Sequence, residues 1–165
     1  MKYILSEKLM SIGNHFTILD ENKNKLFYVD GKVLTIGEKL YINDTSGKRI
    51  FTIKKKLIRL TDTYSIEKDG KVYATLRKDL INIISDKFDL KSPYGDIRIK
   101  GNFIDYDYKF KLNGDVIANV SKKFIAIRDK YIVEIDNFED PLLILACTVI
   151  IDMISHENKN RKNDE

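Results

Sequence analysis

The chain has little of what stabilises secreted proteins or anchors proteins in membranes. Its 165 residues include one cysteine, Cys147, so no internal disulfide can form and a reducing, cytoplasmic compartment is expected. The N-terminal residues become charged again after a very short apolar stretch, unlike a signal peptide. The apolar run 142–154 is interrupted by Asp152 and is shorter than the ~20 residues that span a bilayer. We therefore expect no transmembrane segment.

Enzyme motifs are also missing from the sequence. It has no glycine-rich phosphate loop, no Gly-x-Ser-x-Gly motif and no CxxC, HExxH or EF-hand pattern. The two histidines, His15 and His156, are far apart in sequence and are interpreted as a surface residue and a cation at a helix end. Burial within the apolar run would make Cys147 unreactive. The sequence thus predicts that the protein is not an enzyme and has no catalytic residues, metal ligands or cofactor.

A 14-residue pattern of apolar positions recurs along most of the chain. Its six copies start 24, 24, 23, 23 and 21 residues apart, which indicates a repeated structural unit. The copies begin at Leu5, Val29, Ile53, Leu76, Ile99 and Val120. Residues that accept tight turns lie between successive copies: Asn24, Gly47, Gly70, Gly95 and Gly114.

Within each copy the apolar residues change from odd to even positions near positions 5 and 6. Because a strand alternates faces with a period of two, this change indicates a corner between two strands. Six repeats of strand, corner, strand and hairpin turn predict about twelve antiparallel strands. Alternating strands of this number bury one face and remove their edges by closing into a barrel. With strands about 4.8 Å apart and tilted about 40°, the lumen would be on the order of 12 Å wide.

The C-terminal apolar run would fill that lumen. Asp140 is a natural N-cap and Pro141 suits the first helical turn, so we expect a helix over 141–155. Its side chains are apolar on nearly every face, as in a helix surrounded by protein. A helix with its side chains is about as wide as the lumen. We therefore predict one domain over 1–156, mainly β, with a closed twelve-stranded antiparallel barrel around the helix, and a disordered polar tail over 157–165.

Several short motifs occur in order along the chain: Glu7-Lys8-Leu9, Phe16-Thr17-Ile18, Val29-Asp30-Gly31-Lys32, Gly101-Asn102-Phe103, Val120-Ser121-Lys122-Lys123-Phe124 and Glu139-Asp140-Pro141. Together they resemble the LURP-one-related (DUF567) family, in its short bacterial form, over residues 2 to about 154. The resemblance implies a fold similar to Tubby C-terminal domains and phospholipid scramblases, in which a twelve-stranded barrel surrounds a hydrophobic helix. Tubby domains bind phosphoinositides, but no Tubby binding residue matches a motif in this chain.

Two features of the sequence suggest sites. In the predicted helix, Thr148, Asp152 and Ser155 form a narrow polar stripe. It is interpreted either as the face that meets polar groups where the helix leaves the barrel, or as a site around a buried carboxylate. In the second case Asp152 would pair with a basic residue or, with Thr148, line a ligand cavity.

The second feature is the placement of basic residues. Positions 2–4 of the six copies contain ten basic and three acidic residues, and equivalent corners would gather them at one end of the barrel. These lysines either keep the barrel soluble or form a basic end that meets an anionic surface. The candidate binding residues are Lys32, Lys54, Lys55, Lys56, Arg77, Lys78, Lys122 and Lys123.

Two functions remain open at this stage. The first is a binding or scaffold module that docks on anionic phospholipid, with phosphoinositide-like headgroups, or on a protein partner. It would be cytoplasmic or peripheral at the membrane. Nucleic acid is disfavoured as a partner because no exposed aromatic residue for base stacking is evident among the lysines. The alternative is a carrier of a small molecule or lipid in a cavity beside the helix. The sequence leaves the oligomeric state open.

Overall fold

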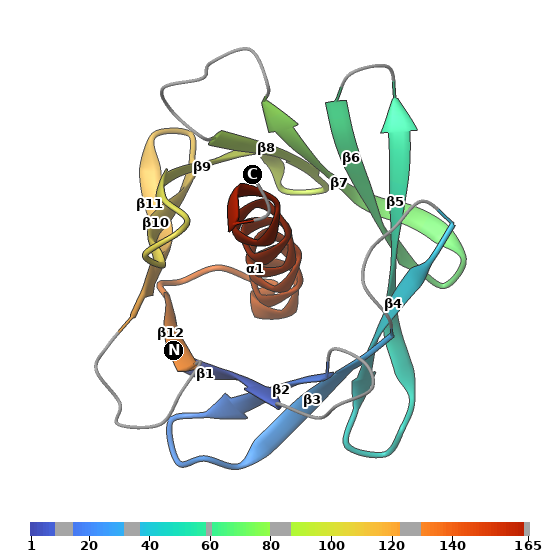
Figure 1. Ribbon diagram of the computed structural model, residues 1–165. Helices are drawn as coiled ribbons and strands as arrows, with labels where there is room; N and C mark the ends of the chain where they lie inside the picture. The colour runs from blue at the N-terminus through green and yellow to red at the C-terminus, as the bar shows by residue number, and fades with distance from the viewer. Residues whose placement is uncertain (9–14, 32–36, 59–60, 80–86, 123–129, 164–165) are drawn as a thin grey trace.

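The computed structural model describes residues 1–8, 15–31, 37–58, 61–79, 87–122 and 130–163. The predicted fold is confirmed: twelve antiparallel strands close into a barrel, and a single helix, α1 (Pro141–Asn163), runs through it (Figure 1). The strands are β1 (Lys2–Lys8), β2 (His15–Asp20), β3 (Lys25–Asp30), β4 (Lys39–Asp44), β5 (Arg49–Ile58), β6 (Thr61–Lys68), β7 (Lys71–Asp79), β8 (Lys87–Ser92), β9 (Gly95–Asn102), β10 (Asp107–Leu112), β11 (Asp115–Ser121) and β12 (Lys130–Ile135).

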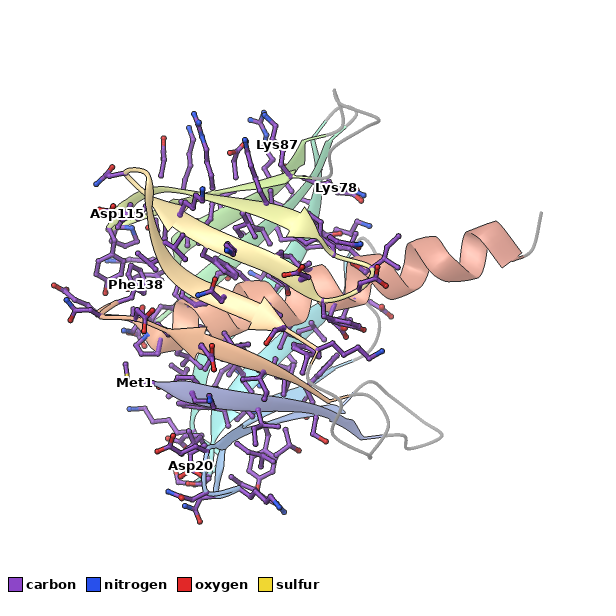
Figure 2. All side chains as sticks on the ribbon, turned by 90° about the vertical axis from the view of Figure 1, so that its left-hand side faces the viewer. Met1, Asp20, Lys78, Lys87, Asp115 and Phe138 are labelled. Atoms are coloured by element: carbon purple, nitrogen blue, oxygen red, sulfur yellow. The ribbon has the colours of Figure 1, made fainter. Side chains whose placement is uncertain are left out.

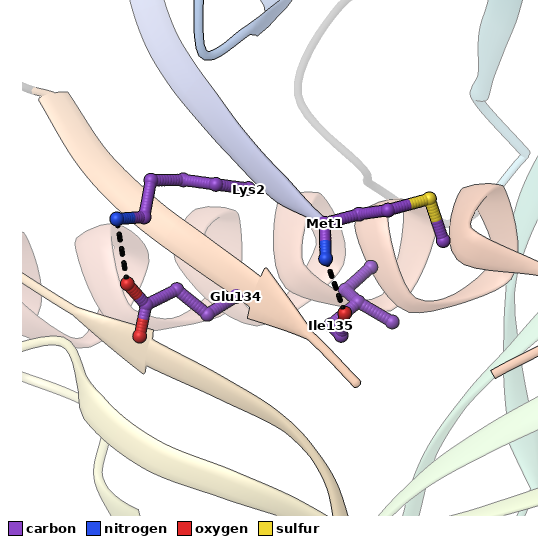
Figure 3. Close-up of polar contacts among 4 residues, drawn as sticks. All are labelled: Met1, Lys2, Glu134 and Ile135. Atoms are coloured by element: carbon purple, nitrogen blue, oxygen red, sulfur yellow. Dashed lines mark hydrogen bonds and ion pairs between the residues drawn. The ribbon is translucent and has the colours of Figure 1, made fainter. Parts of the chain in front are cut away.

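The barrel closes by pairing its first strand with its last. Strand β1 pairs antiparallel with β12, and every other strand pairs with its neighbours in sequence. Beyond the paired residues, the backbone nitrogen of Met1 donates a 2.8 Å hydrogen bond to the carbonyl of Ile135 (Figure 3). The first paired residues, Lys2 and Glu134, also form a 3.0 Å ion pair. Among the twelve described strands, closure leaves no exposed edge on which another chain could pair.

The two ends of the barrel differ in their connections. Short turns after the even-numbered strands lie at one end, the turn end, and the connections after the odd-numbered strands lie at the other, the loop end. At the turn end, Asp69-Gly70 and Asn113-Gly114 all have positive φ, the backbone that two-residue hairpins require. Of the predicted corners, the one at Phe103 and Ile104 lies between β9 and β10, as expected, whereas Leu57 and Ile58 still belong to β5. The other four corners lie outside the described part of the chain.

The helix supplies the core of the barrel. Its residues from Leu143 to Ile151 are almost completely buried on all sides, as the apolar sequence predicts. They pack against the inward residues of the strands, which alternate with outward polar ones. The predicted N-cap is also present, because the Leu143 backbone nitrogen donates to Asp140 Oδ1 at 3.2 Å.

The helix is longer than its apolar sequence predicts. It continues to Asn163, so most of the stretch expected to be a disordered tail, 157–163, is helical. This stretch has no glycine or proline to stop a helix, and extension of an existing helix carries no nucleation cost. Figure 2 shows α1 leaving the barrel at the end where Lys78 and Lys87 lie, opposite to Asp115 and Phe138.

Candidate functional site

The basic residues singled out by the repeat lie toward the loop end. Lys54, Lys55 and Lys56 lie in the last half of β5, Arg77 and Lys78 lie near the end of β7, and Lys122 directly follows β11. All three strands run toward the loop end, so the topology brings these residues to one part of the barrel. The remaining two, Lys32 and Lys123, lie outside the described residues.

Two of these side chains face the inside of the barrel rather than the solvent. Lys55 lies opposite the buried Tyr64, and Lys78 lies opposite the buried Phe88. Each is the third residue of its copy, two positions after an inward residue, so period-two alternation turns it inward. Lys55 and Lys78 therefore lie toward the predicted end of the barrel but on its inner side.

Lys54 and Lys55 are also paired within the protein. The Lys54 ammonium lies 2.6 Å from Glu67, and the Lys55 ammonium lies 3.3 Å from Asp62 and 5.7 Å from the centre of the Tyr64 ring. Only 12% of the Lys55 side chain is exposed. Much of the positive charge of these lysines is thus neutralised locally.

The even-numbered strands add basic residues that the repeat did not indicate. Lys87 in β8 and Lys109 in β10 lie directly opposite Lys100 in β9, one on each side. Together with the predicted residues that are exposed, they form a basic rim, which we define as Lys56, Arg77, Lys87, Lys100, Lys109 and Lys122. Asp105 and Asp107 interrupt it. Only the register between strands shows this arrangement, so single-strand patterns could not have found it.

The polar stripe of α1 is fully enclosed. Thr148 Oγ1 and Ser155 Oγ each donate a 2.9 Å hydrogen bond to the carbonyl four residues earlier in the helix, that of Ile144 and that of Ile151. Asp152 is 2% exposed. Burial, and next the negative charge of Asp152, raise the pKa of the Tyr108 phenol well above its usual value, so the phenol stays neutral.

Three of the grooves in the described part of the chain are lined mainly by residues of the outer wall. They are lined by residues of β6–β9, of β2–β4 with the following turn, and of β9–β10 with its turn. None of the three is lined by a residue of α1. The interpretation of Thr148 and Asp152 as cavity-lining residues therefore gains no support from these grooves.

The fold and the sequence agree with one family of proteins. The family model described as LURP-one-related matches residues 1–152. The chain belongs to the LURP-one-related family. None of the helical residues that the structure describes forms a stretch long and apolar enough to cross a bilayer.

Relatives of the family occur in bacteria and plants. The chain is 26% identical over 160 residues to the uncharacterized protein YxjI of Bacillus subtilis (strain 168), covering 97% of each chain. It is 25% identical over 174 residues to LURP-one-related 10 of Arabidopsis thaliana, covering 92% of this chain and 88% of the relative. A crystal structure of an Arabidopsis thaliana protein has the same fold, with a TM-score of 0.59 and 17% identity over 92% of this chain and 90% of that one.

Proposed function

We propose that the protein is a non-enzymatic binding module that docks on anionic membrane lipid through the basic rim. In this proposal it is a cytoplasmic protein that associates peripherally with the membrane. The partner is a surface of phosphate-bearing headgroups rather than a buried ligand, because the basic residues are spread over several strands instead of converging on one enclosed pocket.

The row of lysines across β8, β9 and β10 is the observation that carries this proposal. Lys100 and Lys109 are exposed and face each other directly across two paired strands, and Lys87 faces Lys100 from the other side. Like charges directly opposite one another destabilise a sheet, so the pair of Lys100 and Lys109 costs free energy in the isolated protein. An anionic surface would offset that repulsion.

Electrostatic attraction between the rim and the headgroups would set the strength and the salt dependence of binding. A basic residue close to an anionic leaflet contributes about 1 kcal/mol, and this attraction decays within a Debye length of about 10 Å at 0.1 M salt. Several rim lysines acting together would hold the protein at the membrane at low salt and release it as salt rises.

Cosedimentation with vesicles tests the proposal. The triple variant Lys56→Gln, Lys100→Gln and Lys109→Gln should bind vesicles with 30% phosphatidylserine at least about tenfold more weakly than the unaltered protein, since three contributions of about 1 kcal/mol are lost. These outward side chains contribute little to stability, so the unfolding temperature should change little.

A charge-matched triple variant at the turn end is the control. Lys23→Gln, Lys48→Gln and Lys71→Gln remove the same charge from exposed positions at the turn end. Equal weakening by both triple variants would mean that net charge alone attracts the protein to the vesicles. At about 100 mM salt the Debye length is about 10 Å, so headgroup contacts should still be felt. Undetectable binding of the unaltered protein at that salt concentration would remove the membrane as its partner and leave a protein partner as the alternative.

A further inference from the structure

A groove on the outer wall of β6–β9 has the chemistry of a separate site. It has a volume of about 520 Å³, which is within the range of small-molecule sites. Its lining includes three basic residues, Arg77, Lys91 and Arg98, and two carboxylates, Asp89 and Asp96. It shares Arg77 with the basic rim, whereas Thr63 and Arg98 lie outside the rim.

Buried hydroxyl groups lie on the β6 side of the groove. Thr63 lines the groove and is 3% exposed, although it lies on the outer face of the sheet, next in sequence to the inward Tyr64. Its Oγ1 has no hydrogen-bond partner among the described residues, and neither does the Oγ of Ser65, two residues further along the same face. A buried hydroxyl without a partner is rare, because its burial costs free energy that a bound group would recover.

Two guanidinium groups flank the groove in register. Arg77 in β7 and Arg98 in β9 both lie opposite Asp89 in β8, one on each side. Within the described residues, none of the groove's basic side chains forms an ion pair with Asp89 or Asp96. The guanidinium N–H groups of Arg77 and Arg98 are therefore available to a ligand. The nearby carboxylates keep the net charge of the groove low.

We propose that this groove binds a compact ligand carrying a phosphoryl group, either a phosphate monoester or a diphosphate. Arg77 and Arg98 donate hydrogen bonds to the phosphoryl oxygens in the forked geometry that guanidinium groups favour. The Thr63 hydroxyl donates a further hydrogen bond from the floor. Asp89 and Asp96 repel a long polyanion that would extend across them, which restricts the site to a small ligand.

Calorimetric titration with inorganic pyrophosphate tests this site. Arg98→Gln should weaken binding about 10- to 100-fold, the effect of losing a charge-assisted hydrogen bond. Thr63→Val should weaken pyrophosphate binding about 3- to 10-fold, the effect of losing a hydrogen bond from an uncharged donor. Thr63→Ser keeps the hydroxyl and should bind pyrophosphate as the unaltered protein does. Arg49→Gln, which removes the same residue type beside the turn after β4, is the matched control and should bind as before.

Competition with vesicles identifies the source of the phosphoryl group. If pyrophosphate displaces the protein from phosphatidic acid vesicles, the groove takes a lipid headgroup; if the protein stays on the vesicles, the groove takes a soluble ligand. The basic-rim triple variant keeps Arg98 and Thr63, so it should retain pyrophosphate binding even where its vesicle binding is lost. Absence of pyrophosphate binding at millimolar concentration, or equal weakening by Arg98→Gln and Arg49→Gln, overturns the groove proposal and leaves the membrane proposal standing.

Discussion

The hydroxyl of Tyr73 in β7 donates a 2.8 Å hydrogen bond to Oδ2 of Asp140, the residue that precedes α1. The other oxygen of the same carboxylate accepts the hydrogen bond from the Leu143 backbone nitrogen. One side chain thus caps the core helix and ties its start to the barrel wall. Burial, followed by hydrogen bonds with Tyr94 and Asp140, raises the pKa of Tyr73, so its phenol remains a donor at neutral pH.

This contact predicts coupled effects on stability. Asp140→Ala should lower the free energy of unfolding by about 1–3 kcal/mol, through loss of the cap and of a hydrogen bond to a charged group. Tyr73→Phe should cost about 1 kcal/mol. The double variant should lose at least about 0.5 kcal/mol less stability than the two single variants lose together. Urea denaturation of the unaltered protein, both single variants and the double variant measures this difference. Strict additivity would show that the two residues act independently.

The helix should be indispensable as the core. Ile150 is completely buried, so Ile150→Ala should destabilise the protein by about 2–5 kcal/mol in urea denaturation. A fragment that stops at residue 139 lacks every buried residue of α1 and should be insoluble or molten. A soluble 1–139 fragment with a cooperative unfolding transition would contradict this account of the core.

Gly101 should tolerate no side chain. Its φ is +146°, and a Cβ atom there would collide with the backbone of Asp107 and Tyr108 on β10. Gly101→Ala should therefore cost about 2–5 kcal/mol, from strained backbone and overpacking together. Gly70 is the comparison, because it also has a positive φ but nothing lies within 4 Å of its Cβ position. Gly70→Ala should cost only about 1–2 kcal/mol, and thermal unfolding of both variants checks the order.

The turn between β4 and β5 should weaken in acid. Asp44 Oδ1 accepts hydrogen bonds from the Ser46 hydroxyl, the Ser46 backbone nitrogen and the Lys48 backbone nitrogen at 2.6, 2.9 and 3.0 Å. The first of these is the main reason that the pKa of Asp44 lies below its ordinary value of 3.8. A lowered pKa means that the turn is stabilised above pH 3.8 and loses this contribution as the pH falls through the lower value. An NMR titration should show the shift, and Ser46→Ala should reduce it.

The thiol of Cys147 should be unreactive in the folded protein. It is completely buried, and burial raises the pKa of the thiol far above its ordinary value, so almost no thiolate forms. Labelling with a thiol-specific reagent at pH 8 should therefore proceed at the rate of unfolding rather than at the rate of the free thiol. Rapid labelling without denaturant would show that α1 leaves the barrel easily.

Local patterns predicted the strands and the helix because each depends on neighbouring residues. The alternation around Ile53, the turn Asp69-Gly70 and the apolar faces of α1 are all visible within a few residues of sequence. The orientation of Lys55 was also available in principle, since it lies two residues after the inward Ile53. The repeat indicates that positions 2–4 gather at one end of the barrel, whereas the alternation indicates which face each side chain takes.

The sites depend on register between strands, which local patterns do not contain. The row of Lys87, Lys100 and Lys109 and the row of Arg77, Asp89 and Arg98 each combine residues from three strands. A shift of one residue in any pairing would place different side chains opposite each other. The length of α1 was underestimated for another reason: composition shows whether a segment can bury apolar surface, but not whether an existing helix extends into it.

The position of α1 after β12 has a consequence for synthesis of the protein. All twelve strands leave the ribosome before the helix that fills the space between them, and β1 must wait for β12 before it gains its second neighbour. The apolar inner faces of the nascent strands thus stay without their core until α1 emerges. Such non-local folding is slow and exposes surface that aggregates. A ribosome stalled before α1 has emerged should therefore hold a chain that is sensitive to protease and retained by chaperones.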